Sequence, residues 1–232
     1  MQIRWKSGTA ILAMVVAAMA CAGVLAPPQA ASAEPAPGTV EGDAAKHLVG
    51  MLGSQFVVFL PPVQEELKLS PEQKQHLQQA REGATQGVKE FMQNIGGLQA
   101  EEQEKKVQEF REVANKNVSM MLSQLLKPEQ QKRLRQIVLQ REGLFALGNP
   151  DVASEVKLTE EQRGKIATLL LETKERFDAL QEKARNGGKP EELAMEAPTI
   201  RKEQEQKIDA LLTDEQRGRW KELLGTPLAL GE

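Results

Sequence analysis

Apolar residues recur at spacings of three and four along most of this chain, the pattern that is typical of amphipathic helices. In the first half, one such stripe runs to Gly96-Gly97 and a second returns toward position 125. In the second half, a helix ends at the breaker 186–190 and a returning helix follows over about 190–212. Pro198 should kink this last helix or shorten its start. No stretch alternates apolar and polar residues as a strand would, so the sequence predicts an all-α fold.

Two segments of the chain recur at nearly the same offset. Residues 63–69, followed by SPEQ, return 89 positions later as 152–158, followed by TEEQ. Residues 125–134 return 86 positions later as 211–220, and Leu134 aligns there with Trp220. The shared offset predicts a tandem pair of helical hairpin units. The first repeat covers 62–148, the second repeat covers 149–226, and 227–232 form a C-terminal tail; whether the repeats form one domain or two stays open.

Residues 43–61 form a further helix candidate upstream of the first repeat. The segment ends in the apolar run Phe56–Leu60, which stands directly before Pro61-Pro62. Two interpretations remain for this run. It packs across the first hairpin as core, or it is an exposed apolar flap that covers or mimics a bound client.

A five-residue motif, L-[ST]-x-E-Q, stands at the predicted start of three helices. The hydroxyl residue is placed to accept a hydrogen bond from the first turn, and the Gln three positions later reaches back to the N-cap N–H, which completes a capping box. A fourth copy at 126–130 has Lys127 at the cap, so we expect that helix to start more weakly. The helix-capping residues are Leu69, Ser70, Gln73, Leu158, Thr159, Gln162, Leu212, Thr213 and Gln216.

These motifs resemble the LTXXQ-motif family of exported proteins, the Spy/CpxP-like group, in two tandem copies. The resemblance implies a small all-α protein of the cell envelope. Some members form dimeric cradles that hold unfolded clients without ATP, and others regulate envelope stress or respond to metals. The cradle proteins are single hairpins that dimerise, whereas this chain carries two predicted hairpins and would mimic such a dimer within one polypeptide.

The resemblance also implies a basic client-facing surface with apolar patches. In this chain such a surface would have to be local, in the two equivalent closing helices, the first of which also carries Lys127 and Arg141. The alternative interpretation is a solvated helix face whose basic residues balance nearby glutamates. The candidate polypeptide-binding residues are Lys132, Arg133, Arg135, Arg217, Arg219 and Lys221.

Residues 1–33 have the pattern of a secretory signal. Two basic residues precede an apolar run that ends at Ala26, and Ala31-Ser32-Ala33 forms a cleavage site. We therefore expect a periplasmic or secreted protein that has no stable membrane span after cleavage and begins with a disordered spacer over 34–42. The alternatives are an uncleaved N-terminal anchor and a lipid anchor at Cys21.

Composition excludes several kinds of chemistry. The chain is 40% apolar and 3% aromatic, with one Cys and a net charge of −3; loss of the signal removes the Cys and two basic residues, which leaves −5. This balance argues against a nucleic-acid binder, and a Cys-free chain has no thiol chemistry. His47 and His76 lack ligand partners at helical spacing, and no catalytic or phosphate-cradling motif occurs. We expect no metal site, no cofactor and no enzymatic activity.

Two function classes remain. The first is an envelope chaperone or stress adaptor that binds unfolded or partner polypeptides through a concave helical surface, with apolar residues for affinity and charges for encounter. The second is a structural protein that docks by its helix faces to one dedicated envelope partner, with metal-responsive sensing as a third option. Hydrophobic stripes pack equally well within or between chains, as in a coiled coil, so self-association also stays open.

Overall fold

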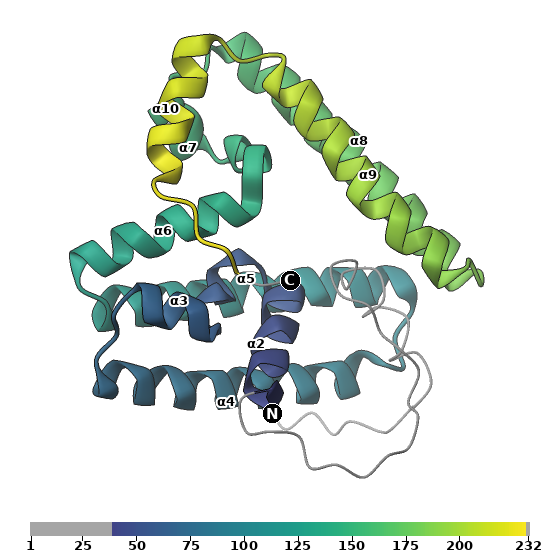
Figure 1. The fold of residues 1–232 in the computed structure, drawn as a ribbon. Helices are drawn as coiled ribbons and strands as arrows, with labels where there is room; N and C mark the ends of the chain where they lie inside the picture. The colour runs from purple at the N-terminus through teal and green to yellow at the C-terminus, as the bar shows by residue number, and fades with distance from the viewer. Residues whose placement is uncertain (1–38, 231–232) are drawn as a thin grey trace. The chain divides into compact units, whose positions relative to one another are not determined.

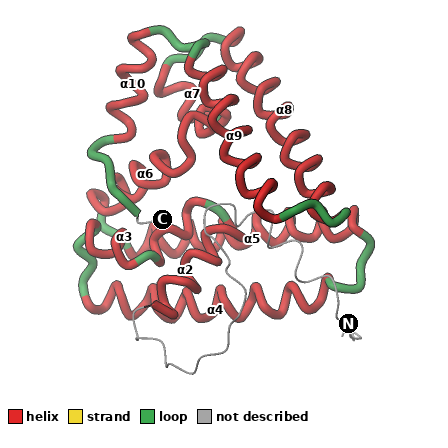
Figure 2. Tube along the Cα trace, turned by 45° about the vertical axis from the view of Figure 1, so that its right-hand side comes forward, coloured by secondary structure: helices red, strands yellow, loops and turns green. Residues whose placement is uncertain are grey.

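The computed structural model describes residues 39–230, so the expected signal sequence lies outside the described residues. Helices make up 84% of the described chain and no strand occurs in it (Figure 2). The prediction of an all-α fold is therefore confirmed. The described residues form two compact units, an N-terminal unit of residues 39–134 and a C-terminal unit of residues 135–230. The boundary between the two units lies between residues 134 and 135, inside a helix, whereas the sequence places the boundary between the two repeats at 148–149.

The elements of both units follow the same order, as Figure 1 shows along the chain. The N-terminal unit contains α2 (Thr39–Leu52), the 3₁₀ helix η1 (Ser54–Phe59), α3 (Pro61–Glu66), α4 (Pro71–Ile95), α5 (Ala100–Leu125) and the start of α6 (Pro128–Glu142). The C-terminal unit contains the rest of α6, then η2 (Gly143–Gly148), α7 (Pro150–Val156), α8 (Glu160–Arg185), α9 (Pro190–Asp209) and α10 (Asp214–Leu224). Helix α6 is thus the last element of one series and the first of the next.

The segment predicted as one helix over 43–61 is divided in two. Helix α2 begins at Thr39, within the range expected to be a disordered spacer, and ends at Leu52. Gly53 has a φ of +115°, which L side chains rarely adopt, so the α-helix stops there and η1 follows. Asn115 of α5 holds this break in place, because its Nδ2 donates to the Leu52 carbonyl at 2.8 Å.

The apolar run Phe56–Leu60 lies in the core of the N-terminal unit. None of its five residues is more than 5% exposed. The Phe56 and Phe59 rings are 5.8 Å apart, and η1 contacts α2, α3, α4 and α5. Four apolar residues in a row cannot all face one side of a 3₁₀ helix, so helices must surround η1 to bury them. The run is therefore core rather than an exposed flap.

The long helices α8 and α9 of the C-terminal unit lie side by side (Figures 1 and 2). Three ion pairs join them across the interface: Glu172–Lys207 at 3.7 Å, Arg176–Glu203 at 2.8 Å and Lys183–Glu196 at 2.8 Å. Between the helices, one apolar cluster contains Phe177, Leu180, Ala184, Leu193, Ala197 and Ile200.

Pro198 lies inside α9, which runs as one helix from Pro190 to Asp209. The expected shortening of the helix start therefore does not occur. Proline removes one backbone donor, and the packing of α9 against α8 outweighs this local loss.

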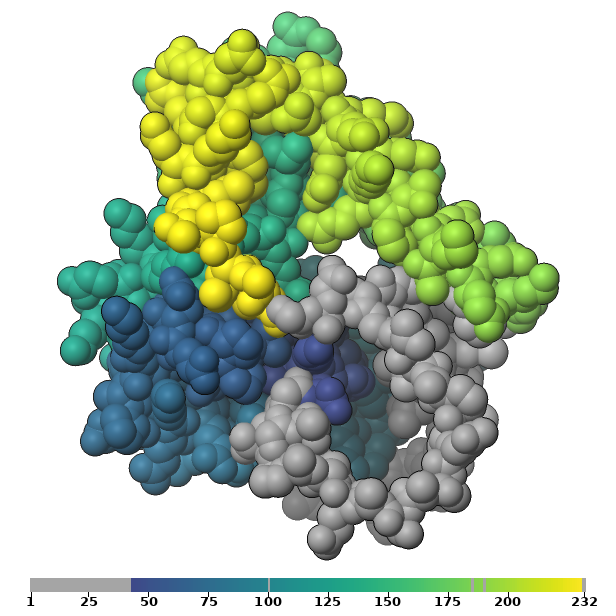
Figure 3. Space-filling view, in the orientation of Figure 1, coloured from purple at the N-terminus to yellow at the C-terminus, as the bar shows by residue number. Residues whose placement is uncertain are grey.

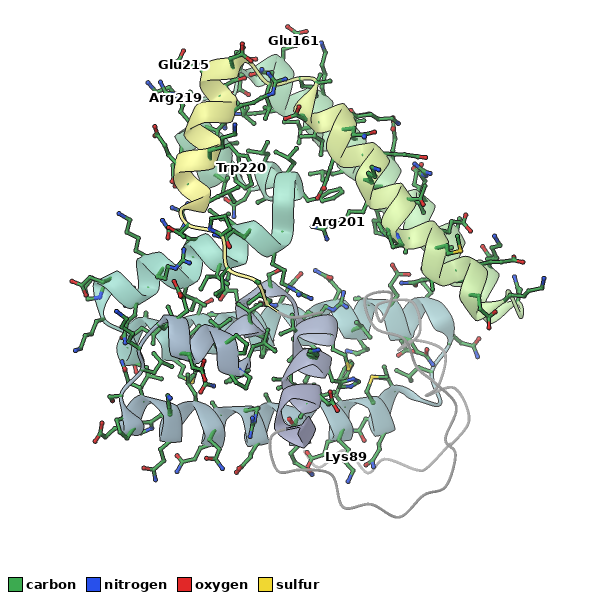
Figure 4. All side chains as sticks on the ribbon, viewed as in Figure 1. Lys89, Glu161, Arg201, Glu215, Arg219 and Trp220 are labelled. Atoms are coloured by element: carbon green, nitrogen blue, oxygen red, sulfur yellow. The ribbon has the colours of Figure 1, made fainter. Side chains whose placement is uncertain are left out.

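A second apolar cluster joins α6, η2, α7, α8, α9 and α10 at the opposite end of the α8–α9 pair. Trp220 of α10 is 7% exposed and packs into this cluster, which Figure 4 shows on the inner side of the unit. Its repeat counterpart Leu134 is also buried. The buried members are Leu139, Ala146, Leu147, Val152, Ala153, Val156, Leu158, Ile166, Ile208, Leu212 and Trp220.

The two units hold the end of their first helix in the same way. In the N-terminal unit, Arg111 Nε donates to the Met51 carbonyl at 2.6 Å. In the C-terminal unit, Arg201 of α9 donates to the carbonyls of Arg141 and Glu142 at 2.8 Å each. Figure 4 shows Arg201 on the inner side of α9. Helix α6 therefore occupies the place in the C-terminal unit that α2 occupies in the N-terminal unit.

Candidate functional site

Capping boxes stand at the starts of α4, α8 and α10. The side chains of Ser70, Thr159 and Thr213 accept from the backbone N–H of their motif Gln at 3.2, 3.2 and 3.3 Å. The N-cap N–H groups donate to the Gln Oε1 atoms at 2.9, 2.9 and 3.0 Å. At α6, the Lys127 N–H donates to Gln130 Oε1 at 2.9 Å. The fourth motif copy thus keeps the glutamine half of the box without the hydroxyl half.

The motif glutamines of the N-terminal unit also bind each other. Gln73 Nε2 donates to Gln130 Oε1 at 2.9 Å, and Gln130 Nε2 donates back to Gln73 Oε1 at 3.2 Å. Each amide sends its second N–H to a backbone carbonyl, from Gln73 to Leu125 at 2.8 Å and from Gln130 to Leu67 at 3.0 Å. The two amides therefore form a closed, self-complementary pair.

The C-terminal unit contains a second pair of the same design. Gln162 Nε2 and Gln216 Nε2 each donate to the Oε1 of the other at 2.8 Å. Their remaining N–H groups reach the carbonyls of Leu211 at 2.7 Å and Lys157 at 3.0 Å. Gln216 is only 7% exposed, so this pair is the more buried of the two. We call both arrangements glutamine clasps.

The clasps explain why the motif ends in Gln rather than Glu. A capping box needs only an acceptor at its last position, which either residue supplies. In a clasp, each amide oxygen accepts twice and each amide nitrogen donates twice, which is the full capacity of a Gln side chain. A carboxylate has no donor, so two glutamates facing each other would repel instead.

Each clasp fixes four helix ends at one point. In the C-terminal unit it joins the starts of α8 and α10 to carbonyls at the ends of α7 and α9. In the N-terminal unit it joins the starts of α4 and α6 to the ends of α3 and α5 in the same way. The motif residues therefore have a structural role, because they tie the starts of two helices to the ends of the two helices that precede them.

The candidate basic residues are held mainly by carboxylates of their own unit. Arg133 Nε lies 2.7 Å from Glu66, Arg217 lies 3.2 Å from Asp209 and 2.9 Å from Asp214, and Arg219 lies 2.5 Å from Glu215. Figure 4 labels Arg219 and Glu215 together on α10. The other members of the candidate set are Arg135, which pairs with Glu155, and the exposed residues Lys132 and Lys221.

Replacement of Arg135 by glutamine should raise the pKa of Glu155. Arg135 donates to both Glu155 oxygens, at 2.9 and 2.6 Å, and this hydrogen bond lowers the pKa of Glu155 below its ordinary value. A lowered pKa in the folded state means that the pair stabilises the fold above the ordinary pKa and loses this effect as the pH falls through the lowered one. Carboxyl-resolved NMR titration measures the shift.

Arg219→Gln is the matched control for this titration. Arg219 lowers the pKa of Glu215 through the same kind of hydrogen bond. The control should raise the pKa of Glu215 and leave that of Glu155 unchanged. If the pKa of Glu155 does not move in Arg135→Gln, the ion pair between them does not exist in solution.

The described residues hold no cluster of three or more potential metal ligands of the His, Cys, Asp or Glu type. His47 and His76 are both exposed. Between Thr39 and residue 230, no helix combines the length and the apolar character needed to cross a membrane. Comparison of the chain with protein-family models, with curated proteins and with solved structures gives no match.

Proposed function

We propose that this protein is an exported polypeptide-binding protein, a chaperone or stress adaptor that works without ATP. The observation that carries the proposal is a set of large apolar side chains that stay exposed on the long helices of both units. Val113 and Met120 of α5 are 58% and 50% exposed, Leu171 of α8 is 63% exposed, and Met195 of α9 is 75% exposed. The signal-like sequence 1–33 supports export.

The apolar residues of α5 form a stripe along one face. Val113 and Met120 are seven positions apart, which is two helical turns, so they point the same way. Phe110, three positions before Val113, is half-buried and stacks on Phe91 with the ring centroids 4.2 Å apart. Methionine adapts its shape to varied partners, and a charged surround favours encounter. An apolar helix face of this kind suits loosely specific contact with unfolded chains.

A second candidate is docking to one dedicated envelope partner. The ion pairs of Arg133, Arg217 and Arg219 favour it, because arginines that are already paired attract unrelated clients less strongly. The two candidates differ in promiscuity. A chaperone binds several unrelated unfolded proteins, whereas a docking protein binds one folded partner tightly.

Aggregation assays with two unrelated clients test the proposal. We expect the chain 34–232 to suppress light scattering of both clients at near-stoichiometric ratios. A Val113→Ser/Met120→Ser variant should lose at least half of this suppression, because it removes the exposed apolar area of α5 without touching the buried core. Asn117→Ser is the matched control, because Asn117 is an exposed polar residue between these two positions.

Three results would contradict the chaperone proposal or its assignment of the client-binding surface to α5. The first is no suppression of either client, together with capture of a single envelope protein in a pull-down, which supports the dedicated-partner alternative. The second is equal suppression by the double variant, which places the binding surface elsewhere. The third is an equal loss in Asn117→Ser, which shows that α5 is sensitive to any change.

A further inference from the structure

Helix α10 ends at Leu224, and the chain continues beyond it as an extended tail (Figure 1). Gly225 ends the helix with a φ of +61°, which favours glycine. A Cβ at this position would collide with the side chain of Gln136 on α6, so Gly225 also allows the backbone to approach α6 closely. Residues 226–230 then follow without helical structure, and they belong to the yellow part of the chain in Figure 3.

One side chain of α6 binds the backbone at the last residue of α10 and at two residues of this tail. Gln140 Nε2 donates to the carbonyls of Leu224 at 2.6 Å and Thr226 at 2.8 Å. The Leu228 N–H donates to Gln140 Oε1 at 3.0 Å. All three contacts are with main-chain atoms, so they do not depend on which side chains the bound segment carries.

The tail side chains alternate in exposure as in an extended strand. Leu228 and Leu230 are half-buried, whereas Pro227 and Ala229 are exposed. This period of two is the one expected of an extended chain with one face against the protein. Main-chain hydrogen bonds plus alternate apolar side chains are also the usual means by which proteins bind extended peptides.

We propose that this part of α6, with Gln140 at its centre, is a peptide-binding seat that the tail occupies in the isolated protein. Its second occupant is an extended segment of a partner polypeptide with apolar residues at alternate positions. The inference rests on the proposed function, because a bound client supplies that segment. The tail then acts as an internal competitor, and a client must displace it to reach Gln140.

Competition follows from the tether. A segment attached only a few residues from its seat has an effective concentration in the millimolar range, so a free peptide of equal intrinsic affinity is largely excluded. Removal of the tail should therefore open the seat. A free peptide with the tail sequence can make the same main-chain contacts with Gln140, so it is the most direct probe of the seat.

Fluorescence anisotropy with a labelled peptide of residues 226–232 tests the seat. A chain that ends at Gly225 should bind the peptide saturably, and the intact chain should bind it at least tenfold more weakly. Gln140→Leu in the shortened chain should weaken binding at least tenfold, whereas Gln206→Leu, at an exposed position on α9, should not. A peptide with aspartate in place of Leu228 and Leu230 should not bind.

Equal binding by the intact and shortened chains, or no effect of Gln140→Leu, would overturn the inference. The full-length Gln140→Leu protein gives a second, independent measurement, because hydrogen exchange at the Leu228 amide should become faster there. Unchanged exchange at Leu228 would also overturn it. Peptide binding without suppression of client aggregation would reject the proposed function and leave the seat in place. Suppression of client aggregation without peptide binding would reject only the seat.

Discussion

Replacement of Gln216 by leucine should lower the free energy of unfolding of the C-terminal unit by about 3 kcal/mol. The substitution keeps a similar volume but removes the amide from a side chain that is 7% exposed. Gln162 Nε2 loses its acceptor, and the Thr213 N–H and the Lys157 carbonyl lose their partners. A buried polar group without a partner costs about 1–3 kcal/mol, which sets the expected size.

Urea unfolding followed by Trp220 fluorescence measures this loss. In the chain 34–232, Trp220 is the only Trp, and it lies in the core of the C-terminal unit, so its signal reports on that unit. Thr213→Ala is the matched control, because it removes the hydroxyl of the same capping box and should cost about 1 kcal/mol. A loss in Gln216→Leu no larger than in Thr213→Ala would show that the clasp adds nothing to the cap.

A double-mutant cycle separates the clasp from the two caps. Gln162→Leu and Gln216→Leu each leave the other amide without its partner, and the double variant removes both amides together. We expect the double variant to lose less than the sum of the single variants, by about 1–2 kcal/mol. Strict additivity would mean that the two glutamines act only on their own helices.

The sequence predicted the helices well because each helix needs only local information. A spacing of three and four puts Leu77 and Ile166 on buried faces, and both are at most 1% exposed. The capping boxes are equally local, since the cap and its Gln lie three positions apart. These features could be read directly from the chain.

The clasps could not be predicted, although their residues were identified. Gln73 and Gln130 lie far apart in sequence, and the capping box already accounts for each of them. The missed signal was the invariant choice of Gln over Glu in all four motif copies of a chain that is rich in Glu. Only the fold shows that both amide N–H groups of each Gln have hydrogen-bond partners.

The sequence repeat also did not predict that α6 is both the last helix of the first series and the first helix of the second. The matching segments relate α6 to α10 through Leu134 and Trp220. The matching segments do not include α2, and the equivalence of α2 and α6 rests on how Arg111 and Arg201 hold the ends of these helices. The end of α2 at Gly53 could not be predicted either, because a single glycine in an apolar stripe does not by itself end a helix.

Replacement of Gln204 by leucine should raise the free energy of unfolding of the C-terminal unit by about 2 kcal/mol. Gln204 of α9 is 0% exposed, and neither its Nε2 nor its Oε1 has a hydrogen-bond partner. The ion pairs Glu172–Lys207 and Arg176–Glu203 place Thr173 of α8 at a similar level, but the Thr173 hydroxyl donates to the Leu169 carbonyl of its own helix. Leucine has a similar volume and needs no partner, so the cost of the buried amide disappears.

The N-terminal unit supplies the reciprocal test. The offset of 86 positions places Val118 where Gln204 stands, and Val118 is an apolar residue that is 6% exposed. Val118→Gln should therefore destabilise the N-terminal unit by about 2 kcal/mol, measured by circular dichroism, while the Trp220 transition stays where it was. If Gln204→Leu instead destabilises the protein, the amide of Gln204 has a partner in solution, and α8 and α9 are held together by a polar contact at that level.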